Sequence, residues 1–293
     1  MADKRKVLVT GATGTQGGEV VRALGESGHD VKALTRDANS DRAGALTARG
    51  ATVVAGDFTD PDTLIRAAEG VDTMFIMTTP FEAGTDAETQ QGITAIDAAK
   101  TAGVGHVVFS SVGDANNNTG IPHFESKFKI EQHLSASGLP FTIMAPVYFM
   151  DNILGPWGGL SADKLTAALP AGRKLQQIAT SNIGDFAASL IERRDSVFGK
   201  RFDIAGDEVA MDTVAAILTK VAGRDIRYEG FLADALRAQS EDLALMYEWF
   251  DRVGYSADIN ALRADFPEVP WLRYDAWASL QDWTGSAERA AAE

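Results

Sequence analysis

The stretch VLVTGATGTQGGEVV, residues 7–21, decides the fold. It begins with aliphatic and β-branched residues typical of a buried strand and ends in an apolar pattern with helical spacing. Between them, Gly11, Gly14 and Gly17 form the pattern G-x-x-G-x-x-G. Such glycines permit a tight turn, a close approach of backbone to a ligand, and close packing of helix on strand. The stretch therefore predicts a strand, a turn and a helix whose first N–H groups bind a pyrophosphate. A tight turn without a ligand is the alternative.

The rest of the first half alternates strand-like and helical segments. Asp60 and Pro61 are typical of a helix N-cap and a first helical residue. The expected strands are 6–10, 30–36, 51–57, 71–77, 106–111 and 141–146, and the expected helices are 15–27, 60–70 and 87–103. Several strands are apolar at consecutive positions, as parallel strands covered on both faces are. Residues 1–150 are therefore expected to form an α/β core, a doubly wound parallel sheet of the Rossmann type.

The second half, residues 151–293, does not continue this regular alternation of strands and helices. It offers two further strands, at 176–180 and 201–206, and a helix at 211–223 with Asp212 as its cap. Residues 233–254 read as one long amphipathic helix, and residues 284–293 as a frayed end. We expect a smaller C-terminal α+β lobe for substrate or partner, packed at the carboxyl edge of the sheet and intertwined with the core.

Composition excludes several classes of function. With 27 Lys and Arg against 41 Asp and Glu, the formal net charge is −14, which disfavours direct binding of nucleic acid. The absence of cysteine excludes disulfides and thiolate chemistry, and the four histidines lack the spacing of a zinc motif, so no metal site is expected. No apolar run is long enough for a signal peptide or a membrane span. The expectation is a cytoplasmic protein, monomeric or homodimeric, without membrane contact.

The end of the second strand bears on cofactor choice. In dinucleotide-binding folds an acidic residue there binds the ribose 2′-hydroxyl, whereas an arginine accommodates a 2′-phosphate. Arg36 occupies this place, which favours NADP(H), and Asp37 follows it, which keeps NAD(H) as a second possibility. An arginine in a solvated loop is the alternative interpretation.

Five motifs together resemble the NmrA-like group of atypical short-chain dehydrogenases/reductases, which includes quinone reductases and redox sensors. They are GATGTQGG at 11–18, TRD at 35–37, GDFTD at 56–60, HFESK at 123–127 and PVYFMDN at 146–152. The resemblance covers most of the chain and is strongest over residues 5–155. It implies a set of cofactor contacts along the carboxyl edge of the sheet. These are Gly11, Thr13, Gly14, Thr15, Gln16, Gly17, Arg36, Asp57, Phe58, Thr78, Thr79, Gln90, Ser110, Lys127, Pro146, Tyr148 and Phe149.

Some of these positions have competing interpretations. Asp57 would accept a hydrogen bond from the adenine amine, but it is also a suitable turn or N-cap residue. Ser110 and Ser111 would place a hydroxyl near a substrate carbonyl, or would simply end the strand. Tyr148 would supply a hydroxyl near the nicotinamide, although an aromatic residue at a strand end more often packs.

The candidate catalytic residues come from the same resemblance. The superfamily uses Tyr-x-x-x-Lys on the helix after the fifth strand, and this chain has His123 and Lys127 at those positions. The tyrosine is absent and the lysine is retained, so Lys127 is expected at the nicotinamide ribose. His123 titrates near neutrality and is a candidate proton relay, or else a cap or packing residue in a loop. Tyr148 is the third candidate.

A set of apolar, mostly aromatic residues predicts a pocket for a flat substrate, built mainly from the later half of the chain. Its members are Phe81, Phe149, Met150, Trp157, Tyr247 and Trp249, although Tyr247 and Trp249 fit better as core residues of their helix. Two functions follow. One is an NADPH-dependent oxidoreductase acting on a quinone, an enone or a similar conjugated molecule, which needs less acid catalysis than a ketone. The other is an NADP(H)-binding redox sensor without turnover.

Overall fold

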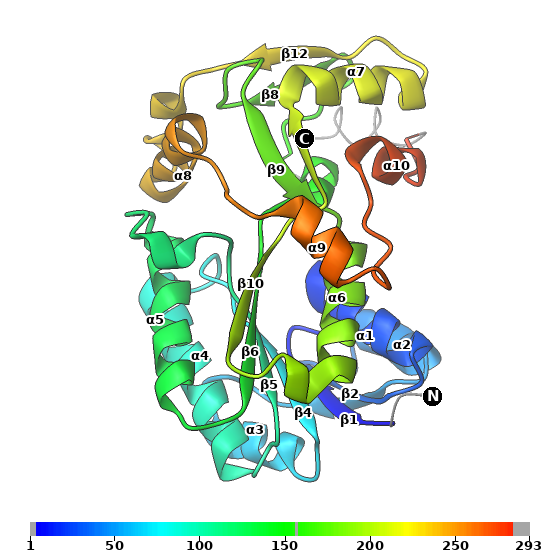
Figure 1. The fold of residues 1–293 in the computed structure, drawn as a ribbon, viewed down its shortest axis with the longest axis vertical. Helices are drawn as coiled ribbons and strands as arrows, with labels where there is room; N and C mark the ends of the chain where they lie inside the picture. The colour runs from blue at the N-terminus through cyan, green and yellow to red at the C-terminus, as the bar shows by residue number, and fades with distance from the viewer. Residues whose placement is uncertain (1–3, 156–157, 284–293) are drawn as a thin grey trace.

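The computed structural model describes residues 4–155 and 158–283. Its centre is a seven-stranded parallel sheet with the order β10-β6-β5-β4-β1-β2-β3 (Figure 1). The strands are β1 (Lys6–Val9), β2 (Asp30–Thr35), β3 (Thr52–Ala55), β4 (Thr73–Met77), β5 (Val107–Ser110), β6 (Phe141–Pro146) and β10 (Lys200–Ile204). The order reverses between β1 and β4, so the predicted doubly wound α/β fold is confirmed.

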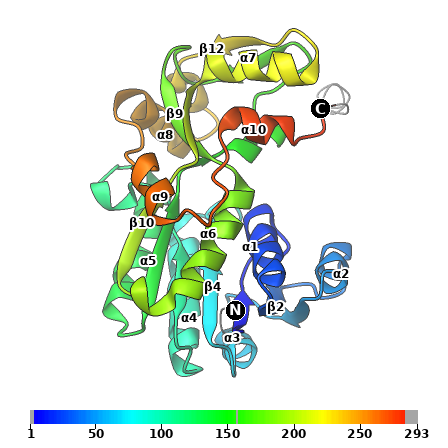
Figure 2. The ribbon, with the colours of Figure 1, turned by 45° about the vertical axis from the view of Figure 1, so that its right-hand side comes forward.

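Helices cover both faces of this sheet (Figures 1 and 2). On one face lie α1 (Thr15–Glu26), α2 (Asp41–Ala48) and α6 (Thr180–Arg193), and on the other α3 (Pro61–Ala68), α4 (Thr85–Thr101) and α5 (Pro122–Ala136). Alternate residues of the strands from β1 to β6 enter different cores: Val7 and Val9 pack beneath α1 and α6, whereas Leu8 packs beneath α3 and α4. The strands are therefore apolar on both faces, as their sequences indicated.

The C-terminal lobe lies beyond the carboxyl ends of the central strands (Figure 1). It contains two small sheets, with orders β11-β9-β7 and β12-β8. Its strands are β7 (Tyr148–Phe149), β8 (Lys164–Ala167), β9 (Lys174–Ile178), β11 (Asp207–Ala210) and β12 (Arg227–Gly230). Its helices are α7 (Met211–Ala222), α8 (Glu241–Arg252), α9 (Ile259–Asp265) and α10 (Tyr274–Ser279). Short 3-10 turns occur at η1 (Ala115–Asn117), η2 (Met150–Leu154), η3 (Arg194–Ser196) and η4 (Ala233–Leu236).

The second half of the chain also completes the core. Strand β10 pairs with β6 in the central sheet, and α6 packs against α1. Residues before and after position 150 therefore share one sheet and the hydrophobic core beneath α1 and α6.

The lobe differs from its predicted elements in two places. The long helix expected over 233–254 is interrupted: η4 ends at Leu236, and α8 begins only after Ser240, whose side chain accepts a hydrogen bond from the Leu243 N–H at 3.2 Å. The Ser240 hydroxyl starts a new helix, which is the usual function of serine at an N-cap. Asp212, predicted as the cap of α7, lies inside the helix, and the N-cap is Ala210.

The crossing of α1 and α6 joins the glycine turn to the second half of the chain. The guanidinium of Arg22 on α1 binds Glu19 at 2.6 Å and Asp185 on α6 at 2.8 Å. Gly184 faces the carbonyl of Glu19 so closely that a Cβ at this position would overlap it. The backbones of the two helices are therefore in near contact.

Across the two described segments, none of the helices combines the length and the apolar character needed to cross a bilayer.

Gly184→Ala should destabilise the protein because the added methyl group forces α6 away from α1. Overpacking of this kind typically costs about 1–3 kcal/mol. The matched control is Gly25→Ala in α1, where a Cβ meets nothing within 4 Å and should stabilise the helix by about 0.5–1 kcal/mol. Urea unfolding followed by circular dichroism measures both changes. Equal free energies of unfolding for the two variants would contradict close packing at Gly184.

Candidate functional site

The turn after β1 lies at the centre of the sheet, beside the end of β4. The Thr10 hydroxyl accepts a hydrogen bond from the Met77 N–H at 2.9 Å and lies 3.3 Å from the Met77 carbonyl. Gly11 has a φ of +61°, and a Cβ there would overlap the side chain of Met77. The turn therefore requires glycine for both its backbone conformation and its space.

The start of α1 carries no side-chain cap. Helices α2 and α3 are capped by Ser40 and Asp60, whereas α1 begins after Gly14 with neither a capping side chain nor an acidic residue in its first turn. A Cβ at Gly17 would overlap the carbonyl oxygen of Gly11, so the helix start packs directly on the turn. Uncapped N–H groups and the positive end of the helix dipole favour an anion, so the site suits the diphosphate of a dinucleotide.

Two predicted contact residues join this helix start to β5. The Gln16 amide donates a hydrogen bond to the Ser110 hydroxyl at 2.5 Å, and both residues are buried. Thr13 is half-buried and Thr15 is exposed at the same turn. The predicted contacts of α1 and β5 thus meet at the carboxyl edge of the sheet.

Arg36, at the end of β2, is held in an ion pair that the sequence did not suggest. Its guanidinium binds both carboxylate oxygens of Glu82 at 2.8 and 3.1 Å, and both side chains are exposed. The hydrogen bond to Glu82 raises the pKa of Arg36. Because Glu82 belongs to the loop after β4, the ion pair crosses the carboxyl edge of β1 between the two loops.

Asp57 follows β3 and forms a turn of its own. Its Oδ1 accepts hydrogen bonds from the N–H and the hydroxyl of Thr59, both at 2.7 Å, and these lower the pKa of Asp57. Phe58 is half-buried against the core beneath α3. The turn interpretation of Asp57 is thus satisfied in the structure, and among the described residues no hydrogen bond reaches its second carboxylate oxygen.

Lys127 occupies a buried polar cluster. Its Nζ donates to the Thr78 carbonyl at 2.6 Å and to the Thr78 hydroxyl at 3.0 Å, and it pairs with Glu88 at 2.9 Å. Glu88 is completely buried on α4 and also accepts hydrogen bonds from Thr78 at 3.0 Å and from Ser126 at 2.5 Å. These contacts use all three donors of the ammonium group, so the cluster fixes the end of β4 between α4 and α5.

Thr79 and Gln90 follow closely in the chain on two members of this cluster, Thr78 and Glu88. Thr79 is half-buried in the loop after β4, and its hydroxyl lies 3.4 Å from the Phe81 N–H. Gln90 is exposed, and its amide lies 3.5 Å from Thr94 on the same helix. Gln90 lies two positions after the buried Glu88, which places the two side chains on nearly opposite faces of α4.

His123 lies in the first turn of α5, one helical turn before Lys127. Its Nδ1 is 2.6 Å from Oδ2 of Asp242, and its backbone N–H donates to Oδ1 of the same carboxylate at 3.1 Å. Asp242 belongs to α8 of the C-terminal lobe. The ring of Phe81 lies 6.0 Å from the imidazole, centroid to centroid. The imidazole is therefore positioned by the opposite lobe and by the loop after β4.

Tyr148 lies at the junction of the two lobes. Its hydroxyl is 3.4 Å from that of Tyr247, and its ring packs edge-on against Phe250 at 6.1 Å. Burial raises the pKa of Tyr148, so the phenol stays protonated at neutral pH. Pro146 is buried and its carbonyl accepts a hydrogen bond from the Gly113 N–H at 2.9 Å, while Phe149 is half-buried.

The predicted aromatic set divides between surface and core. Phe81 is 75% exposed, Met150 is buried, and Trp157 lies outside the described residues. Trp249 is buried and packs on Phe124 at 5.8 Å, which confirms its assignment to the core. Tyr247 is half-buried in the same cluster.

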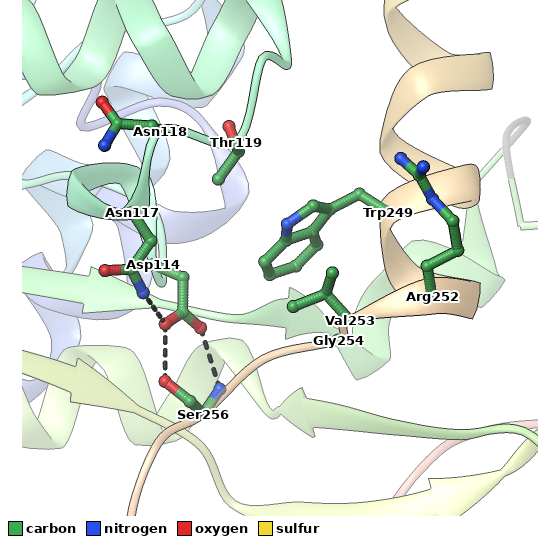
Figure 3. A pocket seen from close by; sticks show the side chains of 9 residues that line it. All are labelled: Asp114, Asn117, Asn118, Thr119, Trp249, Arg252, Val253, Gly254 and Ser256. Atoms are coloured by element: carbon green, nitrogen blue, oxygen red, sulfur yellow. Dashed lines mark hydrogen bonds between the residues drawn. The ribbon is translucent and has the colours of Figure 1, made fainter.

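A separate crevice of about 420 Å³ lies between the loop after β5 and the end of α8 (Figure 3). Asp114 closes one side, with its carboxylate bound to the Ser256 N–H at 2.8 Å and to the Ser256 hydroxyl at 2.5 Å. Trp249 and Val253 form the other side (Figure 3). Within the described segments no group of three or more acidic, histidine or cysteine residues is suitable for a metal ion.

The doubly wound sheet and the open helix start after its first strand define a nucleotide-binding α/β protein. The chain belongs to the NmrA-like family, whose model matches residues 3–278. It is 34% identical over 224 residues to an NAD(P)H azoreductase of Xenophilus azovorans, covering 76% of each chain.

Two solved structures share this fold. The NADPH-dependent quinone oxidoreductase QOR2 of Escherichia coli is 25% identical and superposes with a TM-score of 0.75, covering 93% of this chain and 98% of its own. The transcriptional regulator NmrA, in complex with NAD, shares the fold at 20% identity, with a TM-score of 0.78 and coverage of 96% of this chain and 99% of its own.

Three residues of the site escaped sequence reasoning: Glu82, Glu88 and Asp242. Each is the carboxylate partner of a predicted cation or imidazole. Glu88 carried a weak signal because it lies in the first turn of a helix near Thr78, but acidic residues are common there.

The buried ion pair of Lys127 and Glu88 predicts that removing one of the two charges destabilises the protein more than removing both. Lys127→Met leaves the Glu88 carboxylate buried without its cation, which should cost about 3–5 kcal/mol of unfolding free energy. Adding Glu88→Gln to this variant should recover part of the loss because the buried charge is then removed as well. Urea unfolding measures both variants.

The surface pair Lys164–Glu229 is the control. Its separation is 2.8 Å, but both side chains are at least half exposed. Lys164→Met should cost at most about 1 kcal/mol. Similar losses for Lys127→Met and Lys164→Met would rule out a buried structural role for Lys127.

Proposed function

We propose that the protein is an oxidoreductase that binds NADPH along the carboxyl edge of its central sheet and reduces a flat conjugated acceptor such as a quinone. The observation that carries this proposal is the uncapped start of α1 at the point where the strand order reverses, the place where α/β folds bind dinucleotides. The azoreductase and quinone oxidoreductase relatives support an acceptor of this class.

The cofactor would extend from the end of β2 to the start of α5. The N–H groups of Thr15, Gln16 and Gly17 would hold its diphosphate. Arg36 would bind the 2′-phosphate after leaving Glu82, and this preference makes NADPH the first choice and NADH the second. Asp57 and Phe58 would contact the adenine.

His123 would supply the proton. A bound reduced nicotinamide supplies a hydride, and the acceptor needs one further proton. The overall reaction converts the acceptor, NADPH and H⁺ into the reduced acceptor and NADP⁺. A conjugated acceptor spreads the developing negative charge over several atoms, and a single imidazolium can neutralise it. Lys127, bound to Thr78 and Glu88, would hold the cofactor-facing loop after β4 in place. Tyr148 is the second candidate donor.

A redox sensor without turnover is the second candidate function. The observation in its favour is the complete engagement of the Lys127 ammonium by Thr78 and Glu88, which leaves it no donor for a nicotinamide ribose. The negative transcriptional regulator NmrA, which was crystallised in complex with NAD, shares the fold and supports this candidate.

Gly14→Val tests cofactor binding and function together. A Cβ at Gly14 lies 3.3 Å from the Gly11 carbonyl oxygen, which a small shift can relieve, so the fold should survive while the side chain obstructs the diphosphate. We expect NADPH affinity, measured by titration calorimetry, to fall about 10- to 100-fold, which corresponds to the free energy that overpacking usually costs. NADPH oxidation with quinones and azo dyes should fall with it.

Gly18→Ala is the control because its Cβ would make only an ordinary contact at 3.6 Å with the Ala12 carbonyl. Unchanged NADPH binding by Gly14→Val would disprove the proposed site. Tight NADPH binding by the wild-type protein with no acceptor reduced would favour the sensor.

Glu82→Gln and Arg36→Ala should change cofactor selectivity in opposite directions. Removing the Glu82 charge frees Arg36, so NADPH should bind up to about fivefold more tightly, as an exposed ion pair contributes at most about 1 kcal/mol. Arg36→Ala should weaken NADPH binding by about 1.5–3 kcal/mol through loss of charged hydrogen bonds. NADH affinity, measured in parallel, should barely change in either variant. Equal losses for both cofactors in Arg36→Ala would mean that Arg36 is structural.

A further inference from the structure

The carboxylate of Asp242 makes two contacts with His123, although 119 residues separate them in the chain. Oδ1 accepts the backbone N–H of His123, which lies in the first turn of α5 and has no partner within that helix. Oδ2 lies 2.6 Å from Nδ1 of the imidazole. One carboxylate therefore fixes both the backbone and the ring of the same residue.

These contacts determine which ring nitrogen is available. An ionised carboxylate only accepts hydrogen bonds, so Nδ1 carries the proton and Nε2 holds the lone pair of the neutral ring. Burial raises the pKa of Asp242, but the hydrogen bond and charge of His123 lower it further, so the group is ionised near neutral pH. Across residues 4–155 and 158–283, no protein group forms a hydrogen bond with Nε2.

Aromatic rings and the start of α5 limit the orientation of the imidazole. Phe124 meets it edge-on with ring centroids 4.8 Å apart, and Phe81 lies on another side at 6.0 Å. Only 12% of the His123 side chain is exposed. Lys127, one turn further along α5, binds the end of β4, so the imidazole lies at the carboxyl edge of the sheet next to the loop that carries Phe81.

The two halves of this pair belong to different lobes. His123 is part of the core, and Asp242 lies in the first turn of α8, which stands above the N-terminal end of α5 (Figure 1). The backbone contact and the ring contact both depend on the position of α8 relative to α5. A displacement of the lobe therefore releases the imidazole from its fixed orientation.

We propose that Asp242 is a positioning residue that holds His123 with Nε2 directed to the substrate, so that the proton donor is complete only when the C-terminal lobe is docked on α5. The inference rests on the proposed oxidoreductase function for its catalytic part. In the reaction, the imidazolium gives its Nε2 proton to the acceptor that receives the hydride, keeps its Nδ1 proton on Asp242, and regains the other proton from water.

A double-mutant cycle tests this dependence. His123→Ala should lower kcat for quinone reduction about 100-fold, the low end for general acid catalysis, with NADPH affinity unchanged. Asp242→Ala should also lower kcat, and the isosteric Asp242→Asn should lower it to a smaller extent. In the His123→Ala background, Asp242→Ala should have no additional effect on kcat because it acts through the imidazole. An equal loss with and without His123 would overturn the proposal.

A second His–Asp pair supplies the control. His133 Nε2 lies 2.8 Å from Asp97 in an exposed position at the other end of α5. Asp97→Asn removes a carboxylate of the same kind and should leave kcat unchanged. Circular dichroism and NADPH affinity, measured for every variant, separate an effect on the proton donor from a loss of folding.

The ¹⁵N spectrum of the imidazoles tests the pair without any turnover, with His123→Ala assigning the resonance. Wild-type His123 should show the Nδ1–H tautomer, and Asp242→Ala should shift the population toward Nε2–H. An unchanged spectrum would overturn the positioning role even if the enzyme is active. If no acceptor is reduced by the wild-type protein, the proposed function fails, and the spectrum alone decides whether Asp242 orients the ring.

Discussion

The contact between Gly17 and Gly11 is the constraint on which the rest of the site depends. The first turn of α1 packs so closely on the carbonyl of Gly11 that any side chain at position 17 would overlap it. This contact places the positive end of α1 directly above the ends of β1 and β4, where no side chain caps it. A longer or bulkier turn would move the helix start away from the sheet and from the loops after β2 and β4, which Arg36 and Glu82 join.

The second constraint is the attachment of the C-terminal lobe to the loops that leave the core. Asp114, in a left-handed conformation with φ of 57°, binds Ser256, and its own N–H donates to Asp203 at 2.7 Å. Asp242 binds the start of α5. Both attachments are between a carboxylate and a backbone N–H, which gives direction as well as energy. The loop after β5 and the helix that follows are therefore oriented by the lobe, and α5 carries His123 and Lys127 in that orientation.

Local patterns predicted the core well because they reflect local physics. Strand and helix positions follow from apolar periodicity, and the glycine turn follows from what each glycine permits. The lobe was harder to predict because one segment allows more than one helix start. The helical pattern of 233–254 continues through Ser240, yet the serine hydroxyl caps a new helix there. The short helix α2 was missed, although Ser40 caps it, because its buried face consists of only Ala43 and Leu46.

The partners of the site residues were beyond sequence reasoning for a different reason. Arg36 and Glu82 are 46 residues apart, and His123 and Asp242 are 119 apart, so no spacing rule connects them. A pattern can identify a basic residue at the end of a strand, but the fold decides which carboxylate reaches it. Arg36 shows the consequence, because the residue expected to be free for a 2′-phosphate is already paired.

The engagement of Lys127 changes the chemistry that the site can support. In a Tyr-x-x-x-Lys site the lysine assists a phenol, whereas here the ammonium is neutralised by the buried Glu88 and the phenol is absent. A buried lysine paired in this way makes the site rigid. It contributes little electrostatic field at the substrate, because the Glu88 carboxylate 2.9 Å away compensates its charge. The proton donor that we propose is the His123 imidazole, which the Asp242 carboxylate contacts at 2.6 Å. Such a donor suits acceptors that delocalise the added charge and is poorly matched to simple ketones, whose alkoxide needs a stronger stabilising group. The histidine at position 123, where the superfamily has a tyrosine, therefore favours a conjugated acceptor over a simple ketone.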